Sequence, residues 1–231
     1  MTLAALIFDV DGTLAETEEA HRAAFNAAFA ALGLNWHWTR ADYRTLLKTT
    51  GGKERIRAYL AAQGLAPLAD VEIAEIHAKK TAQYVEILGS GQLPLRDGVA
   101  DLIASARAAG LSLAIATTTS RPNIEALAHC CWGRPAAEVF DVIAAGDEVA
   151  RKKPAPDVFQ LALSRLGVAP DRAIAFEDSL NGLRSAQAAG IRTVVTPSLY
   201  TDDEDHGAAQ WCVPSLALAH LPVEVTRAIA S

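Results

Sequence analysis

The chain has 231 residues, of which 51% are hydrophobic and 21% charged, and its formal net charge is −6. This length suits one large domain or a core with a smaller insert. The acidic balance disfavours non-specific nucleic-acid binding, which needs basic surface, and no stretch reaches the roughly 18 uninterrupted apolar residues of a membrane helix. Three cysteines without motif spacing predict neither a disulfide framework nor a zinc site. We see no signal-peptide pattern and expect a cytoplasmic protein that binds neither nucleic acid nor membranes.

The first part of the chain predicts one buried strand followed only by helices. Residues 3–10 form a continuous apolar run, as in a strand whose sheet is covered on both faces. From about residue 16 to residue 88, apolar residues recur at helical spacing and no strand pattern interrupts them. Thr39 and Asp42 have the spacing of a helix capping box. The expected helices cover residues 20–32, the segment beginning at Thr39, 53–63 and 71–88.

Residues 89–94 (Gly-Ser-Gly-Gln-Leu-Pro) form the best linker candidate, and helices alternate with strands after them. Alternation of this kind predicts a parallel sheet wrapped by helices. We therefore expect an α/β fold, a Rossmann-like doubly wound parallel sheet with an inserted all-α helical cap. The expected core is residues 1–15 and 95–231, and the cap with its linker ends is residues 16–94. The later strands are expected at 111–116, 139–144, 173–176 and 191–195, with helices at 99–109, 122–129, 157–166 and 180–189.

Asp9 and Asp11 lie at the end of the first strand and leave it from the same face, because side chains of a strand alternate with a period of two. A simple Asp-Gly turn would explain Asp11 and Gly12. It would leave Asp9 as a costly buried charge at the end of an apolar strand. A phosphoryl-transfer site gives both carboxylates a role: Asp9 attacks phosphorus and forms an aspartyl-phosphate. Asp11 then protonates the departing oxygen and later takes a proton from the hydrolytic water.

Hydroxyl groups and a lysine occur at two further points of the core. Thr117 and Thr118 follow the strand expected at 111–116, where they either begin a helix or offer hydroxyl and N–H groups to an anion. Lys153 precedes Pro154, which favours an extended backbone at the lysine. The plain interpretation of Lys152 and Lys153 is a solvated pair. The functional one is that Lys153 holds the nucleophile and the phosphoryl oxygens together.

A second acidic pair, Glu177 and Asp178, directly follows the strand expected at 173–176. These carboxylates could be ordinary charges at a helix N-terminus. Alternatively, Asp9 and Asp178 with a backbone carbonyl and waters supply the oxygen ligands that Mg²⁺ prefers. Ligands of an open α/β sheet bind beyond the carboxyl ends of its strands. We therefore expect the acidic pairs to converge on one metal and phosphate site.

These motifs resemble those of the haloacid dehalogenase-like hydrolase superfamily along the whole chain: Asp9-Val10-Asp11-Gly12-Thr13, Thr117, Lys153-Pro154 and Glu177-Asp178-Ser179. The resemblance implies that Asp9 is the nucleophile, Asp11 the acid and base, and Lys153 the group that balances charge. It also implies Mg²⁺ bound by Asp9, Asp178 and the Asp11 carbonyl, with Glu177 in the same acidic pair. The helical insert resembles the small cap of that superfamily. Asp11 and Asp178 favour phosphoryl transfer, because the dehalogenases lack the second carboxylate of the first motif and need no metal.

Within this superfamily, three segments are similar to the CbbY-type phosphatases, close relatives of the β-phosphoglucomutases: residues 15–21, 49–55 and 177–183. CbbY-type proteins occur with Calvin-cycle genes and dephosphorylate sugar bisphosphates, notably xylulose 1,5-bisphosphate. The similarity implies a phosphorylated sugar as substrate and a Mg²⁺-dependent sugar-phosphate phosphatase as the activity.

The cap loop is the expected site of a second, untransferred phosphate. Gly51 and Gly52 expose N–H groups before a helix, and Lys53 adds positive charge. Arg55 adds positive charge too, although the plain alternative, a flexible turn with solvated cations, fits Arg55 better than Lys53. Lys80 is a second candidate ligand, although an exposed helix lysine is the default. The candidates for the sugar hydroxyls are Glu18, His21 and Tyr43.

Two rival functions use the same residue types. A phosphomutase shares the aspartyl-phosphate but returns the phosphoryl group to a sugar hydroxyl. A receiver-like signalling domain also has an acidic pocket, a hydroxyl and a lysine, but the cap of roughly 70 residues and Asp11 speak against it. We expect a monomer, and we expect the acidic run at 201–206 to be a solvated loop.

Overall fold

The central strand β1 (Ala5–Phe8) is apolar and fully buried, as its sequence predicts. It pairs in parallel with β2 (Ser112–Ala116) on one side and with β4 (Ala173–Glu177) on the other. The computed structural model describes residues 2–91 and 93–230. Within them all strand pairs are parallel, in the order β3-β2-β1-β4-β5-β6, and the doubly wound α/β prediction is confirmed. The remaining strands are β3 (Val142–Ala144), β5 (Arg192–Val195) and β6 (Trp211–Cys212).

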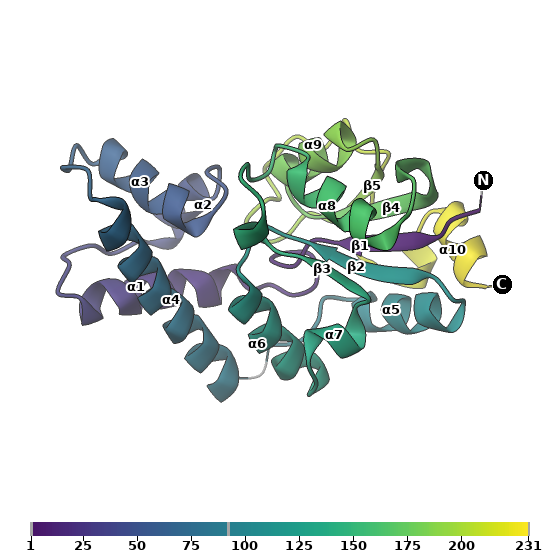
Figure 1. Cartoon of the computed structure of the whole chain (residues 1–231), viewed down its shortest axis with the longest axis horizontal. Coiled ribbons are helices and arrows are strands. Elements are labelled where there is room, and N and C mark those ends of the chain that lie inside the picture. The colour runs from purple at the N-terminus through teal and green to yellow at the C-terminus, as the bar shows by residue number, and fades with distance from the viewer. Residues whose placement is uncertain (1, 92, 231) are drawn as a thin grey trace.

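Helices cover both faces of this sheet (Figure 1). Because side chains alternate along β1, Leu6 and Phe8 join one apolar cluster while Ala5 and Ile7 join another on the opposite face. The first cluster is built with α5 (Val99–Ala108), α6 (Arg121–Trp132), α7 (Ala136–Val139) and α10 (Val223–Ile229). The second is built with α8 (Asp157–Leu166) and α9 (Leu180–Ala188).

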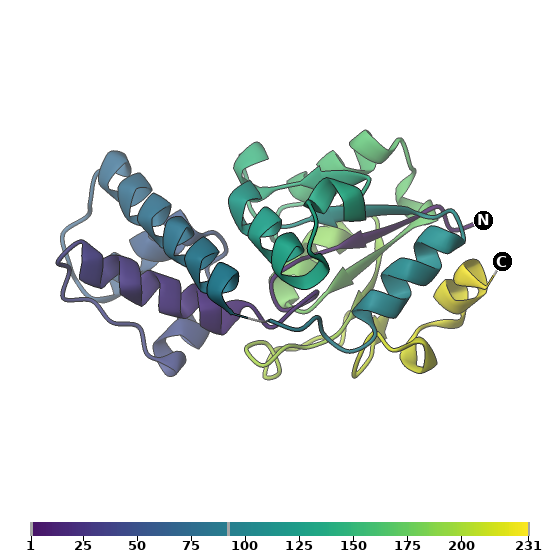
Figure 2. The ribbon, with the colours of Figure 1, turned by 90° about the horizontal axis from the view of Figure 1, so that it is seen from below.

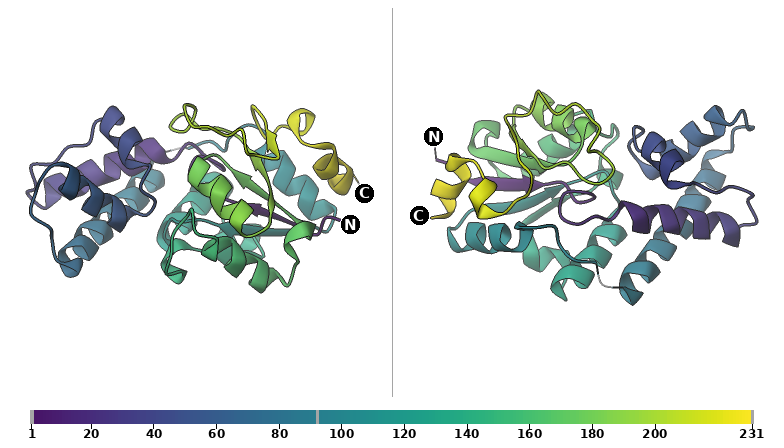
Figure 3. Two further views of the ribbon diagram at one scale, coloured as in Figure 1. Left: turned by 90° about the horizontal axis from the view of Figure 1, so that it is seen from above. Right: turned by 180° about the vertical axis from the view of Figure 1, so that it is seen from behind.

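A helical unit lies beyond the carboxyl ends of the strands, and the chain passes to and from it between β1 and α5 (Figures 2 and 3). Its own centre is a buried aromatic cluster that includes Phe25, Phe29, Trp38 and Tyr43. The expected capping box is confirmed, because Asp42 N–H donates to Thr39 Oγ1 and Asp42 Oδ2 accepts from Thr39 N–H. The helices are α1 (Glu18–Ala31), α2 (Arg40–Leu46), α3 (Gly52–Ala62) and α4 (Asp70–Ser90).

The structure differs from the sequence expectations at several element ends. Helix α4 continues through Ser90, so the linker expected at 89–94 is shorter, and its Gln92 lies outside the described residues. The strand expected at 139–144 begins only at Val142, because α7 precedes it. Strand β6 and helix α10 were not predicted, because both are too short to leave a clear periodic pattern. Short 3₁₀ helices lie at Gly146–Glu148, Pro170–Arg172 and Leu218–His220.

Across residues 2–91 and 93–230, every helix is too short or too polar to span a membrane. The division into a core of residues 1–15 and 95–231 and a cap of residues 16–94 stays our proposal.

Candidate active site

The site lies at the carboxyl ends of β1 and β4. Successive strands are added on one side of β1 up to β3 and on its other side from β4 onward. In the pair of β1 and β4, Phe8 is opposite Phe176, so Asp9 and Glu177, one residue further on, emerge side by side. The Asp9 N–H donates to the Phe176 carbonyl (2.9 Å), which fixes the start of the loop after β1. This is the position where open α/β sheets bind ligands. The core sequence therefore places its acidic motifs together through the register of two strands.

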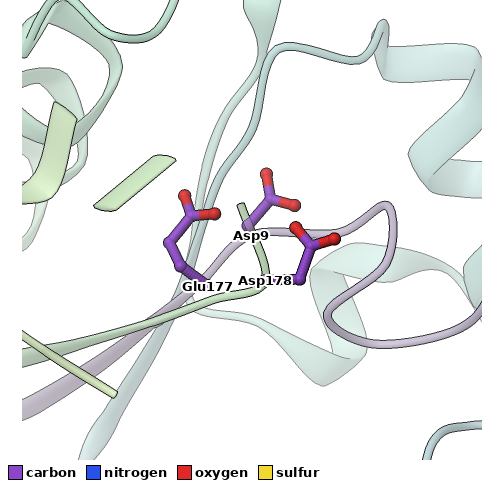
Figure 4. Close-up of side chains that lie close together, drawn as sticks. All are labelled: Asp9, Glu177 and Asp178. Atoms are coloured by element: carbon purple, nitrogen blue, oxygen red, sulfur yellow. The ribbon is translucent and has the colours of Figure 1, made fainter. Parts of the chain in front are cut away.

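Three buried carboxylates meet there, from Asp9, Glu177 and Asp178 (Figure 4). One oxygen of each lies within 4.8 Å of the others. Lys153 Nζ donates to Asp9 Oδ1 and to Glu177 Oε1, at 2.6 Å each. The ammonium thus pairs with two of the three carboxylates, and its proximity to both raises its own pKa against the opposing effect of burial.

The charge of this cluster is incompletely balanced. Burial raises the pKa of Asp178 well above its ordinary value, and the neighbouring Asp9 and Glu177 raise it further. Burial also raises the pKa of Glu177 to about 8, although Lys153 opposes the shift. Burial raises the pKa of Asp9, and Lys153 and the Thr117 hydroxyl oppose this. Carboxylates crowded in this way fit a bound divalent cation, because a cation would let all three ionise.

Glycine is required at two points around the cluster. Gly12 has a φ of 82°, and a Cβ there would lie 2.2 Å from Asp178 Oδ2, so only glycine allows this close approach. A Cβ on Gly182 would likewise overlap the Glu177 carboxylate. Glu177 Oε2 has no hydrogen-bond partner among the described residues, while its Oε1 accepts from Lys153. Glu177 therefore holds Lys153 through its Oε1 oxygen, beside Asp9 and Asp178.

Asp11 lies apart from the carboxylate cluster and is held from the cap side. The Thr17 hydroxyl donates to Asp11 Oδ1 (2.6 Å), and His21 Nε2 lies 2.9 Å from the same oxygen. Lys80 Nζ donates to His21 Nδ1 (2.6 Å), which leaves the Nε2 proton of His21 for Asp11. Burial acts to raise the pKa of Asp11, but His21, Thr17 and Lys80 outweigh it and the pKa falls below its ordinary value. The side chain of Asp11 therefore faces the cap, and its expected contact with a metal involves only the main-chain carbonyl.

Lys80 is buried, contrary to the default for a helix lysine. Its ammonium lies 5.1 Å from the ring centroids of both Phe25 and Tyr84. Burial lowers its pKa to about 7, and the charge of Asp11 opposes this shift. Burial also lowers the pKa of His21 to about 4. Together these groups form a polar connection from the cap to Asp11.

A cavity of about 590 Å³ separates core and cap. From the core it is lined by Asp9, Asp11, Lys153 and Asp178 together with Thr117 and Thr118. The predicted ligands on its cap side are Glu18, His21, Gly52, Lys53 and Lys80.

Two expectations about the cap need correction. Tyr43 lies outside the cavity wall that the described residues form, because its hydroxyl is occupied behind that wall: it donates to Glu18 Oε2 (2.9 Å) and accepts from Arg55 Nη1 (3.0 Å). Arg55 is not a solvated cation: its guanidinium lies over the Tyr43 ring and it lines the cavity. His77, which also lines the cavity, was missed because a single helix histidine carries no motif.

The fold and the site define a class of enzyme. The chain belongs to the haloacid dehalogenase-like hydrolase family, whose sequence model matches residues 3–190. It is an enzyme of the phosphatase type within that family, and the resemblance found in its motifs is confirmed.

Among its relatives, the protein CbbY of Rhodobacter capsulatus is 58% identical over 95% of this chain and 96% of its own length. CbbY of Cereibacter sphaeroides is 57% identical, with 92% of each chain covered. The crystal structure of a variant of CbbY from Rhodobacter sphaeroides in complex with xylulose-(1,5)bisphosphate matches with a TM-score of 0.90 and 56% identity, over 94% of this chain and 96% of that one.

Proposed function

We propose that the chain is a Mg²⁺-dependent phosphatase of a pentulose bisphosphate such as xylulose 1,5-bisphosphate. One observation carries this proposal: a single cavity has phosphate-handling groups on two opposite sides. Asp9, Lys153 and Asp178 lie on the core side, and Lys53 and Arg55 lie on the cap side. A ligand with a phosphate at each end would fit both. The xylulose-(1,5)bisphosphate complex of a 56% identical relative supports the same substrate class.

In the first step, Asp9 would attack phosphorus while the bond from phosphorus to the sugar oxygen breaks. Asp11 would give the leaving oxygen its proton. Asp11 has a lowered pKa, but a phosphate dianion beside it would raise that pKa, because like charges disfavour the ionised form. In the second step, water would attack phosphorus, Asp11 would take the proton of that water, and the bond from Asp9 to phosphorus would break to release inorganic phosphate.

Three core groups would manage the charge of this reaction. Lys153 already contacts Asp9 and would hold the nucleophile against a phosphoryl oxygen. The Thr117 hydroxyl is hydrogen-bonded to Asp9 and would keep its orientation. Asp9, Asp178 and the Asp11 carbonyl would hold Mg²⁺, which would supply positive charge to the phosphoryl group.

Mg²⁺ should stabilise the protein, and more so at alkaline pH. The raised pKa values of Glu177 and Asp178 mean that the metal-free folded state retains protons that the unfolded chain releases. Metal-free stability should therefore fall as pH rises toward about 8. At 100 times its Kd, Mg²⁺ would add about 2.7 kcal/mol, or about 5 to 10 °C in Tm for a chain of this size.

Calorimetry with Mg²⁺ and with EDTA measures this gain in stability. At pH 5 the gain should be smaller, because the cation competes with protons for the same carboxylates. Asp178→Asn should remove most of the gain at pH 8. An equal gain in wild type and Asp178→Asn would place the cation elsewhere.

Lys53→Ala should weaken binding of the bisphosphate far more than binding of a substrate with one phosphate. Loss of a hydrogen bond to a charged phosphate raises KM about 10- to 100-fold, whereas p-nitrophenyl phosphate has no group to reach Lys53. Steady-state kinetics on both substrates measures the difference. Lys79→Ala, at an exposed lysine of the same helical unit, is the matched control and should change neither KM. Equal effects of Lys53→Ala on both substrates would mean that the distal phosphate binds at a site other than Lys53.

The phosphomutase alternative predicts different products, and ³¹P NMR distinguishes them. A phosphatase releases inorganic phosphate from xylulose 1,5-bisphosphate. A mutase converts β-glucose 1-phosphate with a bisphosphate primer into glucose 6-phosphate, with little free phosphate.

We also propose a cytoplasmic monomer, whose size gel filtration with light scattering would measure.

A further inference from the structure

The acidic run at 201–206 is only in part the solvated loop that its sequence predicts. Asp202 and Asp203 are exposed, but Thr201 and His206 are buried, and the two aspartates contact Arg44 of the cap. We call residues 198–204 the strap: they follow β5 in the core and reach the cap helix α2. The strap therefore needs an explanation beyond solubility.

On its cap side, the strap holds one guanidinium. Arg44 Nη1 of α2 donates to Asp202 Oδ1 (2.6 Å) and to Asp203 Oδ1 (2.9 Å), and Nη2 donates to the Leu199 carbonyl. The side chains are 36%, 63% and 66% exposed for Arg44, Asp202 and Asp203. Single exposed ion pairs contribute little to stability. Here one planar cation joins three acceptors on a single loop, which fixes the geometry of the strap relative to the cap.

The strap also inserts an aromatic side chain into the cap. Tyr200 is buried and belongs to the aromatic cluster at the centre of the helical unit. Its ring lies edge-on to Tyr43, with centroids 5.8 Å apart, and its hydroxyl donates to Glu19. A core residue is therefore part of the packing of the cap in this arrangement.

On its core side, the same strap supports the carboxylate cluster. The Thr201 hydroxyl donates to the Asp178 carbonyl (2.8 Å) and lies 3.3 Å from Asp178 Oδ2. The Ser198 N–H donates to the Thr201 hydroxyl oxygen (2.9 Å), which fixes that hydroxyl beside Asp178. Glu204 Oε2 accepts from the Leu180 N–H (2.6 Å) at the start of α9. The loop that binds the cap is thus the loop that orients Asp178.

We propose that the strap couples docking of the cap to the orientation of Asp178, and that Arg44 is the positioning residue that makes this coupling. This inference rests on the proposed phosphatase function, because it concerns how the same site is assembled. Arg44 touches no reacting atom. It acts through the strap, so that the carboxylate cluster takes its final arrangement when the cap lies over it.

The test compares Arg44→Ala with Arg57→Ala. Arg57 also makes an exposed ion pair, to Asp70 at 2.8 Å, but within the cap alone. Arg44→Ala should lower kcat/KM for xylulose 1,5-bisphosphate about tenfold and raise the Mg²⁺ concentration for half-maximal activity, while Arg57→Ala changes neither. Arg44→Lys should restore part of both the kcat/KM and the Mg²⁺ response, because lysine keeps the positive charge but lacks the planar guanidinium.

Two readouts separate this coupling from simple structural support. From about 0.1 M to about 1 M NaCl the screening length falls from about 10 Å to about 3 Å, so wild type should lose activity with salt and Arg44→Ala should lose much less. Small-angle scattering of the metal-free proteins should give a larger radius of gyration for Arg44→Ala than for wild type or Arg57→Ala.

Equal radii of gyration for wild type and Arg44→Ala would overturn the coupling, whatever the activity. So would the same Mg²⁺ dependence in an active wild type and Arg44→Ala. An inactive wild type would instead overturn the proposed function, and the scattering comparison would still decide whether Arg44 holds the cap.

Discussion

Asp9→Asn abolishes phosphate release in this account, with a loss on the order of 10⁵-fold or more, as expected when a catalytic nucleophile is removed. The amide keeps the shape of the side chain but does not attack phosphorus. The fold should remain, because Lys153 keeps its contact with Glu177 and the cluster loses one of three crowded carboxylates. Turnover is measured by phosphate release, and folding by circular dichroism and Tm.

Asp9→Asn in metal-free form should unfold at the wild-type temperature or above it, because repulsion among the carboxylates falls. An active Asp9→Asn, within about a hundredfold of wild type, would assign the nucleophile to another group or to water. Loss of activity together with loss of the fold would contradict the expectation that Asp9 serves chemistry rather than stability.

Lys153→Met should have the second largest effect, on activity and stability together. Removing one partner of a buried ion pair typically costs about 3 to 5 kcal/mol, and here two carboxylates lose their shared cation. The Lys153 charge lowers the pKa of Asp9 against the larger effect of burial, so its removal raises that pKa. The nucleophile is active when ionised. The acid limb of the kcat/KM profile should therefore move to higher pH in Lys153→Met, measured at saturating Mg²⁺.

Lys152→Met is the matched control for this prediction. Lys152 Nζ donates to the main-chain carbonyls of Gly146 and Val149 rather than to a carboxylate. Its substitution should leave the acid limb where it is in wild type. An acid limb that moves equally in both variants, or in neither, would contradict the role given to Lys153.

The core side of the site could be predicted from sequence because the fold itself brings its parts together. Apolar runs identify β1 and β4, and parallel pairing then places Asp9 next to Glu177 and Asp178. A strand end needs no side-chain detail to be located. The alternation of apolar strands with helices likewise predicts the doubly wound sheet. Strand β6 has only two residues, which is too short for a hydrophobic pattern to indicate it.

The cap side could be predicted only in part, because its contacts depend on how two units dock. Nothing in the sequence indicates that Lys80 will donate to His21, or that His21 will reach Asp11. The alternative of a solvated Arg55 was wrong for the same reason: its partner Tyr43 is twelve residues away and becomes a neighbour only when α2 and α3 pack.

The surroundings of the acidic run at 201–206 could be predicted only in part. Charge density predicted solvent exposure, which holds for Asp202 and Asp203 but not for Thr201. The hydroxyl of Thr201 is buried against Asp178, and the two exposed aspartates meet Arg44 from the cap. Composition describes a segment on its own, whereas these contacts involve residues elsewhere in the chain: Asp178 is 23 positions away, and Arg44 is more than 150.

The most direct test of a capped sugar-bisphosphate phosphatase is kcat/KM for phosphate release from three substrates, with Mg²⁺ and with EDTA. The substrates are xylulose 1,5-bisphosphate, xylulose 1-phosphate and xylulose 5-phosphate. We expect the bisphosphate to exceed both monophosphates by about tenfold or more, as one charged hydrogen bond to a second phosphate would give, and EDTA to abolish release. Monophosphates hydrolysed as well as the bisphosphate, or release that persists in EDTA, would contradict the account.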